Sequence, residues 1–246
     1  PLSADEDIQG VLSIYDETQK MLSTLTGMDT FSLNPFAGAH GEQTGLMIIK
    51  KYHEKKGNHH KNIIIVPDNA HGTNPASAII CGFKVVEIKS NLDGTVNLEA
   101  LDAVLDDNVA GLMLTNPNTA GVFEKDIRLI ANKVHAKDGL LYYDGANLNA
   151  LVGVARPADM GFDVMHINLH KTFSTPHGGG GPGSGPVGVI KELKNFLPNP
   201  QVVFEDHQFK RIDNKDSIGR VGGFIGNTLV YLRAYVYMRS LGKENL

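Results

Sequence analysis

Apolar residues recur along the chain with two different spacings. Over residues 5–26 they return every three or four positions and Gly27 follows, a pattern typical of an amphipathic helix and its end. Residues 28–35 are expected to be a short strand or an extended segment. Continuous apolar runs predict buried strands at 63–66, 84–89, 110–115, 140–143, 163–169 and 187–190. Helical spacing predicts helices over 42–52, 74–81, 98–105, 123–136 and 227–241.

This alternation predicts an α/β protein whose sheet is mostly parallel and covered by helices on both faces. In such sheets ligands bind beyond the carboxyl ends of the strands. Asp144, Thr115–Asn116 and His170–Lys171 all lie at expected strand ends. Their side chains are therefore expected to converge although they are distant in the sequence.

The composition narrows the class of protein. Of the 246 residues 41% are hydrophobic and 20% are charged, which is ordinary for a soluble protein, and the net charge of −4 argues against a nucleic-acid partner. No apolar run is long enough to span a membrane and no secretory leader is recognisable, so we expect a cytoplasmic protein without a membrane partner. Cys81 is the only cysteine and is expected to be a small buried side chain. Because the chain begins at Pro1 and ends at Leu246 just after a helical stretch, a fragment or processed piece is expected.

The stretch 166–177, followed by glycines at 178–181, combines an apolar run with a histidine and a lysine. A strand that ends on His170 and Lys171 and opens into glycines places an amine where a small molecule can approach the backbone. A lysine that reacts with a carbonyl must lose its proton, and the neighbouring histidines favour the neutral amine. The alternatives are a solvated surface lysine and a structural ion pair with Asp144.

Asp144 supplies an acid at the same expected edge of the sheet. An aspartate opposite a pyridine nitrogen keeps that nitrogen protonated and makes the ring an electron sink, so Lys171 and Asp144 together favour pyridoxal phosphate chemistry. The small residues 38–41 at a helix start suit a phosphate group, with a plain helix cap as the alternative. His71, in the polar loop 68–75, is placed to stack on a flat ligand or to move protons, and the alternative is a residue that structures the loop.

Two other patterns do not predict a site. The glycines at 178, 180 and 183 have dinucleotide-binding spacing, but they follow a lysine loop and not a bare strand. His166 and His170 are four residues apart, a spacing that suits a metal on a helix, whereas a strand is expected here. No metal is therefore expected.

These motifs together resemble the P protein of the glycine cleavage system, and specifically subunit 2 of its two-subunit form. The resemblance covers nearly the whole chain. The segments that carry it are Asn-Leu-His-Lys-Thr-Phe at 168–173, Pro-His-Gly-Gly-Gly-Gly-Pro-Gly at 176–183, Ala-His-Gly-Thr-Asn-Pro-Ala at 70–76, Asn-Pro-Asn-Thr at 116–119, Tyr-Asp-Gly-Ala-Asn at 143–147 and Ala-Gly-Ala-His-Gly-Glu at 37–42.

The resemblance implies the large domain of a fold-type-I enzyme that depends on pyridoxal 5'-phosphate. It implies three catalytic residues: Lys171 carries the cofactor, Asp144 pairs with the pyridine nitrogen, and His71 stacks on the ring. Further cofactor contacts are implied for Ala146 on the opposite ring face, Thr119 near the ring hydroxyl, Ala39 and His40 at the phosphate, and His170 beside the lysine.

The implied reaction is decarboxylation of glycine, with transfer of the aminomethyl group to the lipoyl arm of the H protein. The implied partner is subunit 1 of the P protein, in a hetero-oligomer. Another fold-type-I enzyme, such as an aminotransferase or amino-acid lyase, and a catalytically silent assembly subunit are the alternatives.

For the domains, we expect a helical segment over 1–30 and the cofactor-binding large domain over 31–246. The family's small C-terminal domain and its N-terminal closing segment are expected to be absent. Their absence is expected to expose an apolar patch on the last helix at Tyr231, Tyr235 and Met238.

Overall fold

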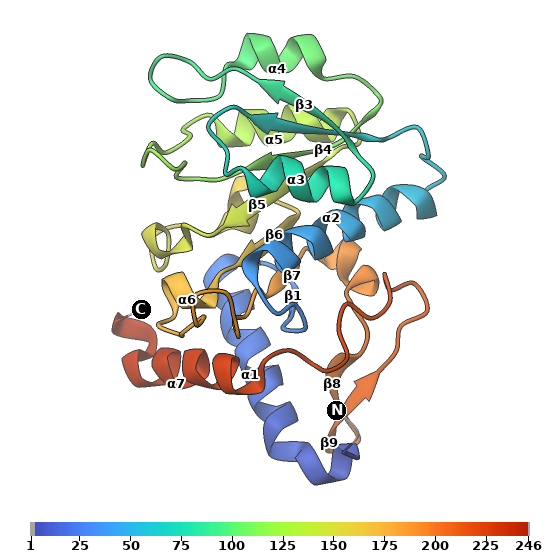
Figure 1. The fold of residues 1–246 in the computed structure, drawn as a ribbon, viewed down its shortest axis with the longest axis vertical. Coiled ribbons are helices and arrows are strands. Elements are labelled where there is room, and N and C mark those ends of the chain that lie inside the picture. Colours follow the sequence, from blue (N-terminus) through green and yellow to red (C-terminus); the bar gives the residue numbers. More distant parts are fainter. Residues whose placement is uncertain (1–2, 246) are drawn as a thin grey trace.

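A seven-stranded sheet forms the centre of the molecule, in the order β1-β7-β6-β5-β4-β2-β3 (Figure 1). The computed structural model describes residues 3–245, with side chains described for residues 3–242. β6, β5, β4, β2 and β3 run parallel, whereas β7 is antiparallel to both of its neighbours, so the mostly parallel sheet expected from the sequence is confirmed. The strands are β1 (Thr30–Ser32), β2 (Ile63–Pro67), β3 (Lys84–Ile88), β4 (Val109–Leu114), β5 (Leu140–Gly145), β6 (Val164–Ile167) and β7 (Val187–Val189).

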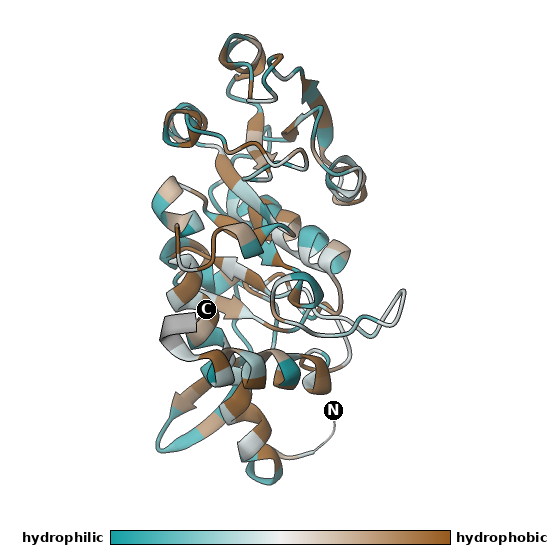
Figure 2. Ribbon diagram, turned by 90° about the vertical axis from the view of Figure 1, so that its left-hand side faces the viewer, coloured by the Kyte–Doolittle hydropathy of each residue, from teal (hydrophilic) through white to brown (hydrophobic). Residues whose placement is uncertain are grey.

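Helices cover both faces of the sheet, as expected, and Figure 2 shows them from the side. On one face α2 (Gly38–Lys55) and α3 (Thr73–Ile80) close a core that includes Leu46, Ile64 and Tyr142. The other face has its own core, which is built by the remaining long helices. These are α1 (Gln9–Thr26), α4 (Leu98–Val104), α5 (Ile127–Ala136) and α7 (Thr228–Asn245, with a kink at Gly242).

Helix α2 lies unusually close to the sheet because glycines face the strands. A methyl group added at Gly45 would overlap the ring of Tyr142 on β5, and one added at Gly41 would lie 2.9 Å from Cβ of His166 on β6. These glycines therefore bring the beginning of α2 next to the carboxyl ends of β5 and β6.

The N-terminal helix α1 is held against α7 and β1. The ring of Tyr15 packs edge-on against Tyr231 with centroids 5.7 Å apart, and its hydroxyl accepts a hydrogen bond from the Leu33 N–H. Two of the residues named for an exposed patch on α7 are wrong, because Tyr231 and Met238 are buried, whereas Leu229 and Val236 of the same helix are exposed. Tyr235 is half-buried and donates a hydrogen bond to Glu17 on α1.

Two of the element boundaries that differ from the prediction have a clear structural cause. β6 ends at Ile167, and the residues 169–172 form a single helical turn, α6 (Leu169–Thr172). The partner strand β5 ends opposite Ile167, so the ladder cannot continue. Helix α5 begins at Ile127 and not at residue 123, because the buried Glu124 donates its N–H to Asn116 and accepts the N–H of Val96 through its carboxylate.

The segment 191–226, for which the sequence predicted no element, contains a two-stranded hairpin. Its strands β8 (Gln201–Glu205) and β9 (Gln208–Ile212) are joined by Asp206 and His207, both with positive φ. Such turns normally use Asn-Gly or Asp-Gly, and the strands are only partly buried, so neither signal of a hairpin is strong here. The described 3₁₀ helices are Asp5–Ile8, Leu148–Ala150, Pro157–Met160 and Lys191–Phe196.

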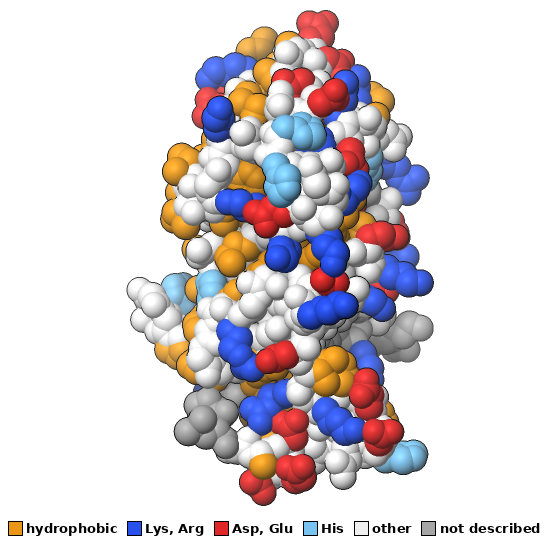
Figure 3. Space-filling view, turned by 90° about the vertical axis from the view of Figure 1, so that its right-hand side faces the viewer, with side chains coloured by type: hydrophobic (Ala, Val, Ile, Leu, Met, Phe, Trp, Pro, Cys, Tyr) orange, Lys and Arg blue, Asp and Glu red, His pale blue; other side chains and the backbone are white. Residues whose placement is uncertain are grey.

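The surface view in Figure 3 shows basic and acidic side chains interspersed on one face of the molecule. Ion pairs on the surface include Lys56 with Asp138 and Arg220 with Asp213. Among the described residues, no helix combines the length and the apolar character that crossing a membrane requires. Cys81 is buried, as expected, and burial raises the pKa of its thiol to about 11.

We predict that Gly45→Ala lowers the free energy of unfolding by about 1–3 kcal/mol, because the new methyl group cannot displace the fully buried ring of Tyr142. Gly10→Ala on α1 is the matched control, since its methyl group meets nothing within 4 Å, and it should raise stability by at most about 1 kcal/mol. Urea unfolding monitored by circular dichroism measures both changes. Equal effects of the two substitutions would contradict the close approach of α2 to the sheet.

Candidate active site

A cavity of about 480 Å³ lies where β5, β6, α6 and the first turn of α2 meet. Asp144 is the fifth residue of β5, and Asn168 directly follows β6, so both come from carboxyl ends of neighbouring parallel strands. Six of the residues predicted for the site line this cavity, namely Ala39, His71, Asp144, Ala146, His170 and Lys171.

Lys171 reaches the cavity from the helical turn α6 and is exposed. Within the described part of the chain no ion pair joins it to Asp144, which lies beside His166 instead. The structural ion pair considered from the sequence is therefore excluded. His170 packs its ring against His177 at 4.2 Å between centroids, and burial, followed by the charges of His177 and Lys171, lowers the pKa of His170.

Asp144 is 2% exposed, so its charge is almost completely removed from water. One carboxylate oxygen accepts a hydrogen bond from the Asn74 side chain at 3.0 Å, and the other accepts the N–H of Ala146 at 3.0 Å. Burial alone raises the pKa of Asp144, but the charge of His166 and these two hydrogen bonds outweigh it and hold the pKa below its usual value. The cavity therefore contains a fixed negative charge.

The first turn of α2 forms another wall of the cavity. Ala37, at its N-cap, is extended and provides no side-chain cap, and Gly38 and Ala39, which carry the first N–H groups of the helix, line the cavity. The start of α2 is thus not the side-chain-capped helix start that was the alternative to a phosphate site. A methyl group added at Gly38 would overlap the side chain of Asn168, so only glycine allows this close approach.

Among the described residues, two buried polar atoms of the cavity lining have no hydrogen-bond partner, Oδ1 of Asn168 and Nδ1 of His170. Unsatisfied buried polar groups are uncommon in folded proteins. Their place in the lining of this cavity fits a polar ligand bound there.

Two predicted residues lie outside the cavity lining. Nδ1 of His40 accepts the N–H of Phe36 at 3.1 Å, and the two rings pack edge to face, which turns the imidazole toward the loop before α2. Burial lowers the pKa of His40, and a hydrogen bond with the backbone of Val221 opposes this shift. Thr119 donates its hydroxyl to the carbonyl of Asn69 at 3.0 Å, so it contacts the loop that carries His71.

His71 is connected to α2 through side chains that the sequence analysis did not single out. Its Nδ1 lies 2.7 Å from Oγ1 of Thr73, and this hydroxyl donates to the carboxylate of Glu42 at 2.7 Å. Ser77 donates to the other oxygen of Glu42 at 3.1 Å. One sequence signal could have indicated Glu42. It lies four residues before Leu46 and seven before Ile49, so a charged side chain falls on the apolar face of a helix.

We predict that Glu42→Ala accelerates amide hydrogen exchange over residues 68–77 by at least about tenfold, because Thr73 and Ser77 lose their acceptor. Gln43→Ala changes the neighbouring, half-buried residue of the same helix and should leave this exchange unaltered. Mass spectrometry of peptides from this loop measures the difference. Unchanged exchange in the Glu42 variant would show that its carboxylate does not hold the loop.

The sequence of this chain is similar to those of known proteins. The family model described as glycine cleavage system P-protein matches residues 4–210. A probable glycine dehydrogenase (decarboxylating) subunit 2 from Caldanaerobacter subterraneus is 61% identical over 247 residues, covering 100% of this chain and 51% of the relative. The protein of the same name from Staphylococcus saprophyticus is 57% identical over 248 residues and covers 100% of this chain and 50% of the relative. The chain thus spans about half the length of these relatives.

The fold of this chain is similar to those of solved structures. A crystal structure of glycine decarboxylase (P-protein) of the glycine cleavage system, in inhibitor-bound form, superposes with a TM-score of 0.80 at 21% identity, over 99% of this chain and 56% of that one. A sphingosine-1-phosphate lyase from Burkholderia pseudomallei gives a TM-score of 0.67 at 18% identity, over 98% and 57% of the two chains. These likenesses confirm the expected fold-type-I architecture. Because the family model matches most of its length, the chain belongs to the glycine cleavage system P-protein family.

Proposed function

We propose that this chain forms the cofactor-binding part of a pyridoxal-phosphate-dependent glycine decarboxylase. The observation that carries the proposal is Lys171, a lysine without an ion-pair partner among the described residues, in the same cavity as the buried anion Asp144. A reactive amine and a fixed carboxylate at one edge of a parallel sheet are what this cofactor requires. The names of the relatives, glycine dehydrogenase (decarboxylating) subunit 2, support glycine as the substrate.

The residues present fit the cofactor. The uncapped N–H groups at the start of α2, with the unpartnered Asn168 beside them, suit its phosphate group. Asp144 suits the protonated ring nitrogen, and Lys171 suits the aldehyde. When bound, the cofactor supplies an electron-withdrawing ring that stabilises negative charge on the carbon that loses carbon dioxide.

The protein's own groups have separate tasks in this proposal. Asp144 stays anionic because its hydrogen bonds and His166 lower its pKa. His71 uses Nδ1 for Thr73, which leaves Nε2 as the ring nitrogen available to a ligand. The low pKa of His170 keeps that imidazole neutral near pH 7, so it adds no second positive charge beside Lys171.

Gly180 and Gly181 of the glycine-rich segment 178–181 line the cavity and form its rim in this proposal, and all four glycines of the segment have positive φ. Side chains other than glycine rarely adopt this conformation, so the rim is made of backbone alone. A rim of this kind leaves room for a long, thin group to reach the cavity. We propose that this group is the lipoyl arm of the H protein, which accepts the aminomethyl group.

The remaining parts of the proposal concern the assembly. Residues 31–246 would form the cofactor-binding domain and residues 1–30 a helical segment that packs on it. We propose a cytoplasmic hetero-oligomer with subunit 1 of the P protein. The designation of the relatives as subunit 2 supports a partner subunit.

Replacing Lys171 tests the attachment of the cofactor. We expect Lys171→Ala, mixed with pyridoxal phosphate, to lose the visible absorbance and the borohydride-resistant label that the unaltered protein shows, because the amine that reacts with the aldehyde is missing. Lys84→Ala, an exposed lysine on β3, is the matched control and should keep both signals. Retention of the label in the Lys171 variant would refute the assignment.

Replacing Asp144 tests the electronic role. We expect Asp144→Asn to keep the absorbance of bound pyridoxal phosphate but to lose at least about 100-fold in the exchange of labelled carbon dioxide with the carboxyl group of glycine. An amide cannot hold the ring nitrogen protonated. Near-normal exchange by this variant in the complete assembly would contradict the proposed role.

A further inference from the structure

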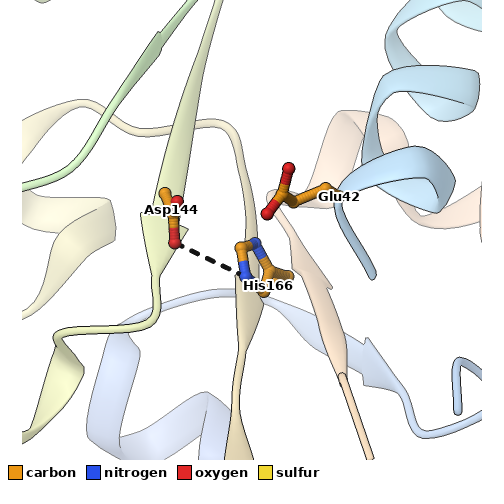
Figure 4. Close-up of side chains that lie close together, drawn as sticks. All are labelled: Glu42, Asp144 and His166. Atoms are coloured by element: carbon orange, nitrogen blue, oxygen red, sulfur yellow. Dashed lines mark ion pairs between the residues drawn. The ribbon is translucent and has the colours of Figure 1, made fainter. Parts of the chain in front are cut away.

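His166 is a buried histidine whose only task so far is to lower the pKa of Asp144. It lies on β6, is 1% exposed, and has Asp144 of β5 on one side and Glu42 of α2 on the other (Figure 4). Its Nε2 is 3.5 Å from Oδ1 of Asp144. Gly41 packs against its Cβ, which leaves little freedom for the ring to move.

The hydroxyl of Tyr142 fixes the orientation of this imidazole. It lies 2.8 Å from Nδ1 of His166, and Tyr142 is fully buried. Burial, and then the charges of Glu42 and Asp144, raise the pKa of Tyr142 well above its usual value, so the phenol keeps its proton. Nδ1 is therefore engaged by the phenol, and Nε2 is the N–H that faces the carboxylate of Asp144.

The three side chains Glu42, Asp144 and His166 have the spacing of a metal site, with ligand atoms within 4.8 Å of one another. Each carboxylate oxygen, however, already accepts a hydrogen bond from the protein. Glu42 accepts from Thr73 and Ser77, and Asp144 accepts from Asn74 and Ala146. The arrangement is thus a hydrogen-bonded cluster in which every oxygen of the two buried carboxylates already accepts one hydrogen bond.

The two oxygens of Asp144 are not equivalent in this network. Oδ1 accepts the N–H of Ala146 and also lies 3.5 Å from Nε2 of His166, an electrostatic contact longer than a strong hydrogen bond. Among the described residues Oδ2 accepts a hydrogen bond from Asn74, and it keeps a lone pair for a ligand. Glu42 repels the carboxylate of Asp144, and the N–H of His166 attracts it. Without that N–H the attraction is lost, and the carboxylate could rotate about its Cβ–Cγ bond.

We propose that His166 is a positioning residue that acts through Asp144: it holds Oδ1, so that Oδ2 presents its remaining lone pair to the protonated ring nitrogen of pyridoxal phosphate. This inference rests on the proposed function and extends it to a residue that does not touch the cofactor. It also assigns a role to Tyr142, which orients the imidazole.

The test compares two probes that differ only at the ring nitrogen. Pyridoxal phosphate and 1-deazapyridoxal 5'-phosphate, which has a C–H group in that position, are titrated into the complete protein, and dissociation constants are measured by absorbance and fluorescence. We expect His166→Leu to weaken pyridoxal phosphate binding about tenfold and to leave binding of the deaza probe within about twofold. His166→Gln, which restores an N–H donor, should recover most of the lost affinity.

Tyr142→Phe provides a second variant that removes one hydroxyl and keeps the ring volume. It should reduce the preference for pyridoxal phosphate over the deaza probe by about threefold, and it carries the test if His166→Leu does not fold.

Equal weakening of both probes in the His166 variant, or an unchanged preference in both variants, would overturn the proposal. If the unaltered protein shows no preference between the probes, the pairing of Asp144 with the ring nitrogen fails as well, while retention of the label in the Lys171 variant refutes only the attachment site.

Discussion

The buried charge of Asp144 is the constraint on which the rest of the site depends. A carboxylate with 2% exposure is costly unless other groups compensate for the lost water. Here the compensation comes from three separate parts of the fold, namely Asn74 of α3, the backbone of Ala146 after β5, and His166 of β6. The parallel pairing of β5 and β6 places Asp144 opposite His166, so the sheet topology itself fixes part of this environment.

Helix α2 connects this charge to the remainder of the cavity. Its glycines allow it to lie against β5 and β6, and its buried Glu42 holds Thr73 and Ser77 of α3. One helix therefore provides the open N–H groups of its first turn and also positions the loop that carries His71. A shift of α2 would disturb both at once, which links packing of the core to the chemistry of the site.

Lys171, unlike Asp144, is not surrounded by compensating groups. It lies on a single helical turn after β6, beside His170, whose pKa is lowered, and no carboxylate pairs with it in the described part of the chain. Keeping the amine away from Asp144 preserves its ability to react, and keeping Asp144 among hydrogen-bond donors preserves its charge. Two groups that would form an ion pair if they met are thus held in the same cavity with different neighbours.

The sequence by itself determined the alternation of strands and helices, the mostly parallel sheet and the convergence of Asp144 and Lys171, because hydrophobic periodicity and strand-end motifs are local signals. It did not determine that Lys171 lies on a helical turn, since that follows from where the β5 partner strand ends. The hairpin of β8 and β9 was not predicted from the sequence, because its turn residues, Asp206 and His207, are unusual at positive φ. The network of Glu42, His166 and Tyr142 was decided only by tertiary structure, because its hydrogen bonds join residues more than twenty positions apart, and no local pattern encodes which of them will meet.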